Sequence, residues 1–297
     1  MKFEWQYLGD SEIRLKSFLK QQHVSRRLLA KIRHEGGEIL VDNVSGRTID
    51  KIHSKQVVTL LLPPEHGRKT ELVPSYVPLD IIYEDRDLLI INKPAHLTSV
   101  PSKLYLNDSL VNRVCGYYEV RNYRGLIPHI VSRLDRDTSG LVLFTKHRYA
   151  HALLDIQMQQ RKISKQYVAL VEGQLAQSDE FDVHAAIGRD PQSLFKRQVV
   201  ADGQQALTHI KCLQSSAAGS LLLVQPKTGR THQIRVHCAS IGHPLLGDTM
   251  YGGHFRGGLY RQALHCYRLT FKHPLTGKIM TFTAPLKKDM SEYMKNL

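Results

Sequence analysis

The residues best suited to chemistry lie in the segment from His129 to Gly140, which reads HIVSRLDRDTSG. Asp135 lies in its polar turn between Arg133 and Arg136. A carboxylate flanked by two guanidinium groups is expected to be ionised, as a nucleophile or a general base must be. The same residue types also fit a plain turn, in which the aspartate caps the backbone and both arginines point into water.

The element expected to position Asp135 is the apolar run 141–144, which follows the turn at once. An apolar run bounded by turn residues indicates a buried strand, so Asp135 would lie on the loop that enters this strand. A second strand is predicted over 163–172, where side chains alternate between two faces and Lys165 shares a face with Tyr167. That face either lines a cleft or forms a solvated sheet edge.

A third polar segment, 226–237, reads PKTGRTHQIRVH. Thr228 and Gly229 make a turn, and Thr231 is expected to cap a helix with a buried stripe of Ile234, Cys238 and Ile241. Arg230 would then lie beside a helix start, where its guanidinium fork can pair with a carboxylate or a phosphate. An isolated arginine at such a place is more often a surface residue.

Several kinds of site are missing from the sequence. Asp248 and Thr249 stand where a phosphate-cradling loop needs Lys followed by Ser or Thr, and no dinucleotide fingerprint or serine-hydrolase elbow is present. His232 and His237 are five residues apart, one more than the spacing that would aim both at one metal. We therefore expect no metal and no nucleotide cofactor, which leaves an enzyme without a cofactor or a binding protein.

The chain of 297 residues carries a formal net charge of +14, with 42% hydrophobic and 23% charged residues. This composition is that of a globular protein, and the excess of Lys and Arg favours a partner with a phosphate backbone. Anionic lipid is the competing partner. No apolar stretch is long enough to span a bilayer and the first residues lack a signal-peptide core, so we expect a cytoplasmic protein without membrane contact.

The four cysteines, Cys115, Cys212, Cys238 and Cys266, lie far apart and form no Cys-x-x-Cys pair. This spacing fits reduced thiols in a core better than disulfides or a zinc site.

Basic residues are concentrated near the N-terminus, where residues 11–33 hold seven Lys or Arg against one acid. Apolar residues at helical spacing predict two short helices there, the second capped by Ser25, followed by strands over 38–41 and 57–62. The pattern resembles the small RNA-binding domain first described in a ribosomal small-subunit protein. The alternative is a small domain with a solvated basic face. The basic residues that we assign to RNA are Arg14, Lys16, Lys20, Arg26, Arg27 and Lys31.

Prolines and charged residues over 63–78 predict a linker, since a segment of this length is unusual inside one compact domain. We expect a small basic domain with its linker over 1–75 and a second domain over 76–297. The second domain is predicted to begin with a hairpin over 80–91 and to contain helices over 109–120 and 148–161.

Taken together, the segments 133–141, 165–167 and 229–237 resemble the RluA-type family of RNA pseudouridine synthases, over residues 78–290. Shorter matches are 92–95, 247–252 and 263–265. The sequence departs from the family pattern at two positions: Ser132 stands where the family usually has His, and His96 replaces a glycine. The resemblance implies an α+β catalytic domain built on a mixed, largely antiparallel sheet.

The resemblance also implies residue roles. Asp135 would be the catalytic aspartate, Tyr167 the aromatic residue against a flipped uracil, and Arg230 the basic partner of the aspartate. Further RNA contacts would come from Arg133, Arg136, Lys165, His232, Gln233 and Arg235.

The implied reaction converts specific uridines in structured RNA to pseudouridine, and ribosomal RNA is favoured over transfer RNA as the substrate. The base is detached from ribose at N1, turned and reattached through C5, so no cofactor is needed. Asp135 would either add to C6 of the uracil or act at the ribose, and both routes remain open. The alternative to an enzyme is a non-catalytic RNA-binding or ribosome-assembly factor. No protein partner can be inferred.

Overall fold

The computed structural model describes residues 1–65 and 72–297. Its helices are α1 (Leu15–Gln21), α2 (Arg26–His34), α3 (Leu110–Val120), α4 (Arg148–Gln159), α5 (Gln233–Ser240) and α6 (Lys288–Met294), with a short 3-10 helix at Thr249–Tyr251. Its strands are β1 (Lys2–Gln6), β2 (Ile13–Arg14), β3 (Glu38–Val41), β4 (Val44–Ser45), β5 (Lys51–Ile52), β6 (Val57–Leu61), β7 (Ile81–Glu84), β8 (Leu88–Lys93), β9 (His129–Ile130), β10 (Ser139–Thr145), β11 (Ser164–Val171), β12 (Glu180–His184), β13 (Ile187–Arg189), β14 (Arg197–Val199), β15 (Leu207–Ser216), β16 (Gly219–Pro226), β17 (Leu264–Lys272) and β18 (Ile279–Thr283).

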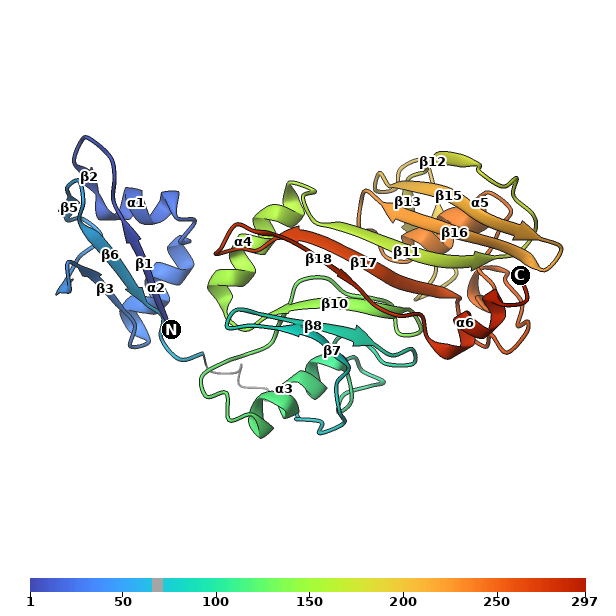
Figure 1. The fold of residues 1–297 in the computed structure, drawn as a ribbon, viewed down its shortest axis with the longest axis horizontal. Coiled ribbons are helices and arrows are strands. Elements are labelled where there is room, and N and C mark those ends of the chain that lie inside the picture. The colour runs from blue at the N-terminus through green and yellow to red at the C-terminus, as the bar shows by residue number, and fades with distance from the viewer. Residues whose placement is uncertain (66–71) are drawn as a thin grey trace.

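The N-terminal part is a separate layer at the left of Figure 1, with α1 and α2 against a four-stranded sheet of order β1-β6-β3-β4. The two short helices predicted within residues 11–33 are confirmed. Ser25 caps α2 as expected, because its Oγ accepts a hydrogen bond from the Leu28 amide at 3.1 Å. Apolar residues at helical spacing, such as Phe18 and Ile32, face a small core, so the basic residues between them face outward.

The rest of the chain is organised by a ten-stranded sheet whose main path runs β12-β15-β16-β11-β17-β10-β8-β7. Neighbouring strands are antiparallel except β10 and β17, which are parallel. The predicted hairpin is formed by β7 and β8, and the predicted strands and helices around Asp135 are formed by β10, β11, α3 and α4. β8 and β10 are buried along their whole length, which accounts for the run of four apolar residues in each.

The loop that carries Asp135 is fixed by the start of β10, where that strand runs beside β17. Gly140 has φ +112°, and a Cβ atom there would lie 2.4 Å from the Cys266 carbonyl oxygen, so only glycine fits. One residue earlier, Ser139 Oγ lies 2.9 Å from His265 Nδ1. Burial lowers the pKa of His265 to about 4, so its ring is neutral in this hydrogen bond.

The two parts of the molecule meet at the first turn of α4. The Tyr149 ring packs edge-on against Phe3 and Trp5, at centroid distances of 5.1 and 6.0 Å. Its hydroxyl donates to the Gln22 carbonyl at 2.7 Å. The basic layer is therefore joined to the large sheet by specific packing as well as by the chain. Of the linker expected over 63–78, residues 66–71 lie outside the described residues, and 72–78 contain no helix or strand.

The cysteines behave as core residues. Cys212, Cys238 and Cys266 are buried, Cys115 is half-buried, and all four are free. Among the described residues, no helix has the length and apolar content needed to cross a membrane.

Candidate active site

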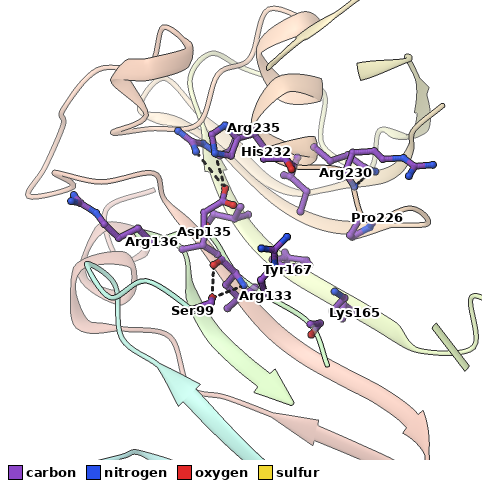
Figure 2. Close-up of a pocket in the computed structure, with 18 of the residues that line it drawn as sticks. Ser99, Arg133, Asp135, Arg136, Lys165, Tyr167, Pro226, Arg230, His232 and Arg235 are labelled. Carbon is purple, nitrogen blue, oxygen red and sulfur yellow. Dashed lines mark hydrogen bonds and ion pairs between the residues drawn. The ribbon is translucent and has the colours of Figure 1, made fainter. Parts of the chain in front are cut away.

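Three segments singled out in the sequence line one cavity of about 650 Å³. They are the loop after β9 with Asp135, the start of β11 with Lys165 and Tyr167, and the segment from β16 into α5 with Arg230. Figure 2 shows these side chains around a common space, although they come from separate parts of the chain. The cavity has the size of sites that bind small ligands or a single nucleotide.

Asp135 is paired with Arg235. Arg235 Nη1 donates to Asp135 Oδ2 at 3.4 Å, and the carboxylate keeps 29% of its side-chain surface exposed toward the cavity. The expectation that Arg230 would be this partner is wrong. The Arg230 guanidinium instead donates from Nε to the Gln205 carbonyl at 3.1 Å and points away from Asp135 (Figure 2). A fixed positive charge beside a carboxylate stabilises its ionised form in general.

Arg235 is held from behind by a second carboxylate. Its Nε and Nη2 donate to the two oxygens of Asp248 at 2.7 and 2.8 Å, and both side chains are buried. Its guanidinium carbon also lies 4.9 Å from the centre of the Tyr251 ring. The two bonds to Asp248 fix the orientation of the Arg235 guanidinium group, so that its remaining nitrogen, Nη1, is directed at Asp135. Asp248 and Tyr251 lie in the segment 247–252, which the sequence analysis matched to the family without assigning a role to either residue.

The start of α5 differs from the expectation. Thr231 does not cap the helix; the N-cap residue is His232, which has φ 58° and no side-chain cap bond. This left-handed backbone turns the His232 ring inward, where Nδ1 lies 2.8 Å from the Tyr251 hydroxyl and Nε2 lies 3.9 Å from Asp135 Oδ2. Burial lowers the pKa of His232 although Asp135 opposes that shift, so the ring is neutral at neutral pH.

Two of the expected RNA contacts face into the protein. Gln233 is buried, and its amide group bonds Thr228, the Arg230 amide, Leu207 and Thr208 at 2.7–3.0 Å. Arg235 is buried by its pairs with Asp248 and Asp135. Both side chains therefore build the cavity wall and are not free to contact RNA phosphates.

Tyr167 and Lys165 both line the cavity from β11, so the structure selects the cleft from the two alternatives left open for their shared strand face. The pairing of β11 with β17 shifts register between Gln166 and Tyr167, which marks a local irregularity of the strand at this point. Burial raises the pKa of Tyr167 well above its usual value, so its hydroxyl is protonated at neutral pH. Burial also lowers the pKa of Lys165.

Arg133 and Arg136 are exposed at the rim of the cavity. Arg136 bonds Asp137 at 3.0 Å and lies over the Tyr105 ring at 5.4 Å. The arginine that bonds Asp135 is Arg235, not either of these two. His96, which departs from the family pattern, has φ 60°. That conformation favours glycine. In this chain the histidine side chain makes a hydrogen bond, with Nδ1 2.9 Å from Asp137 Oδ1.

The basic residues assigned to the N-terminal helices are mostly free of the core. Lys31 is half-buried and pairs with Glu35 at 2.5 Å. The others are exposed, namely Arg14, Lys16, Lys20, Arg26 and Arg27.

One group of possible metal ligands occurs in the described part of the chain, formed by Asp85, Asp87 and His273 with ligand atoms within 4.8 Å. Its members already have partners. Asp87 lies 2.9 Å from His147 Nε2, and Asp85 accepts bonds from backbone amides at 2.7–2.8 Å. Hydrogen bonding accounts for their proximity, and we assign no metal to them.

The sequence of this chain is similar to those of a known protein family. The profile of a family described as RNA pseudouridylate synthase matches residues 87–240. An uncharacterized RNA pseudouridine synthase of Bacillus subtilis, YjbO, is 40% identical over 281 residues, which cover 95% of this chain and 98% of the relative. Ribosomal large subunit pseudouridine synthase D of Pseudomonas aeruginosa is 36% identical over 283 residues, covering 90% and 86%.

A solved structure shares the architecture. Human RNA Pseudouridylate Synthase Domain Containing 1 aligns with a TM-score of 0.56 at 25% identity, covering 71% of this chain and 85% of that chain. The matched family region begins before the Asp135 loop and ends with α5, so it contains all three segments that line the cavity.

Proposed function

The chain belongs to the RNA pseudouridine synthase family, and from that premise we propose that it isomerises uridines of large-subunit ribosomal RNA with Asp135 as the catalytic carboxylate. Its fold is the pseudouridine synthase fold, with a mixed, mostly antiparallel sheet and few helices. The proposal adds the residue roles and the choice of RNA.

The observation that carries the residue assignment is the position of Asp135 in the cavity. Its carboxylate is open on one side and lies 3.4 Å from the buried Arg235 guanidinium on the other. A reactive carboxylate needs this combination, because its charge must be stabilised while one oxygen stays free to approach a ligand. Asp137, two residues later, does not line the cavity, and its Oδ1 is bonded by both Arg136 and His96.

In the proposed reaction a uridine is extruded from the RNA into the cavity, at a cost of about a few kcal/mol for unstacking. The uracil stacks on the Tyr167 ring, and Asp135 assists the break between ribose and N1 by adding to C6 or by acting at the ribose. The base turns and C5 bonds to ribose. The hydrogen on C5 then leaves as a proton and N1 takes one up. Because the Tyr167 hydroxyl is itself protonated, we assign it a relay role, in which it gives up its own proton as it accepts the one from C5. The product is an isomer of the substrate, so atoms balance without a co-reactant.

RNA recognition is assigned to positive charge around the cavity and on the N-terminal layer. We assign the exposed Arg133 and Arg136, together with the half-buried Arg230 and Lys165, to the nucleotides around the extruded uridine. On the N-terminal layer we assign the exposed basic residues of α1 and α2 to the RNA helix that flanks the extruded uridine. This assignment agrees with the resemblance of the layer to a ribosomal-protein type of RNA-binding domain. The excess of positive charge supports both assignments.

Ribosomal RNA is chosen over transfer RNA because similar proteins such as the one of Pseudomonas aeruginosa are named for the large ribosomal subunit. An enzyme that acts on that RNA works in the cytoplasm.

The test is to incubate the protein with in vitro transcripts of large-subunit ribosomal RNA and of transfer RNAs, and to map pseudouridine by carbodiimide modification and primer extension. We expect stops at defined uridines of the ribosomal transcript only. Stops confined to transfer RNA would refute the substrate assignment, and no stops on any transcript would refute the proposed activity.

A further inference from the structure

A lysine that no step of the reaction uses lies buried beside the Asp135 loop. Lys93, the last residue of β8, has no exposed surface and stands opposite Gly140 in the sheet. Its Nζ donates to the carbonyl oxygens of Pro94, Leu97 and Arg136 at 2.9, 2.8 and 2.9 Å. An ammonium has three N–H bonds and no acceptor, so these three carbonyls satisfy it completely.

Ser99 makes a second connection to the same loop. Its Oγ donates to the Leu134 carbonyl at 2.6 Å and accepts from the Leu134 amide at 3.0 Å. Figure 2 shows the Ser99 hydrogen bonds directly below Asp135. Lys93 and Ser99 thus bond the backbone of the residues on either side of Asp135, and both reach it from the segment 93–99.

Burying a lysine is costly, and this site shows the cost. Burial lowers the pKa of Lys93 to about 7, with Asp137 and Asp135 opposing the shift. A methionine or leucine would fill the same space without this penalty. Methionine or leucine could not make the three hydrogen bonds of Lys93, which connect the Arg136 carbonyl to the segment that follows β8.

We propose that Lys93 and Ser99 are positioning residues, which hold the backbone around Asp135 so that its carboxylate meets the extruded base at the reactive distance. The proposal rests on the proposed function. A displacement of about 1 Å between reacting groups lowers a rate by about a hundredfold, so loss of either tether is expected to reduce the chemical step. RNA affinity is expected to persist, because neither side chain is exposed to phosphates.

The experiment compares Lys93→Met and Ser99→Ala with matched controls in the full-length protein. Lys146→Met removes another buried lysine, which pairs with Glu84 at 2.5 Å at the opposite end of β10. Ser220→Ala removes another buried hydroxyl, which bonds the Leu175 amide and the Gly173 carbonyl and also lies 3.0 Å from Ser215 Oγ. Three quantities are measured for each variant: the single-turnover rate of pseudouridine formation with enzyme in excess, the Kd for the ribosomal transcript, and the melting temperature.

We expect Lys93→Met and Ser99→Ala to lower the single-turnover rate about tenfold to a hundredfold. Their Kd for the transcript should stay within about twofold of wild type. Their rates should also be lower than those of control variants that have similar melting temperatures. Rates equal to those of the matched controls would overturn the proposal. If Lys93→Met does not fold, the comparison of Ser99→Ala with Ser220→Ala decides alone. A wild-type protein without turnover on any RNA would refute the proposed function itself, whereas active wild type with unaffected Ser99→Ala refutes only the positioning role.

Discussion

Arg235 and the arginines of α2 carry the same guanidinium group, but the protein holds them in opposite ways. Arg235 is buried, its fork is locked by two bonds to Asp248, and one nitrogen remains for Asp135. Arg26 and Arg27 are exposed on the N-terminal layer, and no acidic residue lies in the first turn of their helix. One charge is fixed in place, and the others are free to adapt.

The difference follows from what each charge is proposed to do. A charge that supports a reacting carboxylate must be oriented before the substrate arrives, because reorientation during the reaction adds to the barrier. A charge that attracts a polyanion acts by releasing counterions and tolerates many geometries. We therefore expect substitutions in the first group to change the rate of reaction and substitutions in the second to change affinity.

The largest effect in this comparison is expected for Arg235→Lys. Lysine keeps the charge but cannot reproduce the fork that bonds Asp248 and Asp135 together. Hydrogen bonds to charged groups contribute about 1.5–3 kcal/mol, so turnover should fall about tenfold to a hundredfold.

The matched variant is Arg230→Lys, five residues earlier at the rim of the cavity. Lysine keeps the positive charge that we assign to RNA, and Arg230 bonds Gln205 instead of Asp135, so turnover at saturating RNA should stay within about twofold. Steady-state kinetics on the ribosomal transcript measures both. Equal losses in the two variants, or a larger loss for Arg230→Lys, would return the role of aspartate partner to Arg230.

An intermediate effect is expected when positive charge is removed from α1 and α2. Replacing Lys16, Lys20 and Arg27 by Gln should weaken RNA binding and reduce the slope of log K against log salt by about 0.7–0.9 for each phosphate that is no longer neutralised. The single-turnover rate at saturating enzyme should not change. The control replaces three exposed lysines near the C-terminus, Lys278, Lys288 and Lys295. An unchanged salt slope, or a slope reduced equally in the control, would contradict the role assigned to the two helices.

The smallest effect is expected at the junction of the two regions. Tyr149→Phe keeps the ring that packs on Phe3 and Trp5 and removes only the hydrogen bond to the Gln22 carbonyl. Loss of one such bond costs about 1 kcal/mol, which lowers the melting temperature by about 2–4 °C for a chain of this size. Calorimetry compares it with Tyr260→Phe, whose ring is exposed. A melting temperature equal to that of the control would show that this hydrogen bond does not join the regions.

The local features of the site followed from the sequence because short-range patterns determine them. The apolar run after Gly140 fixed β10, and strand alternation placed Lys165 and Tyr167 on one face. The mixed sheet came from the resemblance to a family, since strand periodicity does not determine the order of strands.

The partner of Asp135 could not be found from local patterns. Arg230 and Arg235 flank the start of α5, and the choice between them depends on Asp248, thirteen residues later in a different element. The left-handed backbone at His232 has no local signal either: histidine adopts this conformation more often than most non-glycine residues, but most histidines do not adopt it. Lys93 gave a weak signal: with Asn92 it ends a strand that begins with four apolar residues and in which every residue is buried.

The measurement that tests the central claim most directly is tritium release from RNA labelled at C5 of uridine, with wild type and Asp135→Asn compared on the same transcript. The label leaves only when C5 forms its new bond to ribose, so release reports the isomerisation itself. We expect release by wild type, a loss of roughly 10⁴-fold or more in the variant, and RNA binding by both. Equal release by the two proteins would contradict the role of Asp135. No release by wild type that still binds the RNA would indicate a binding protein instead of an enzyme.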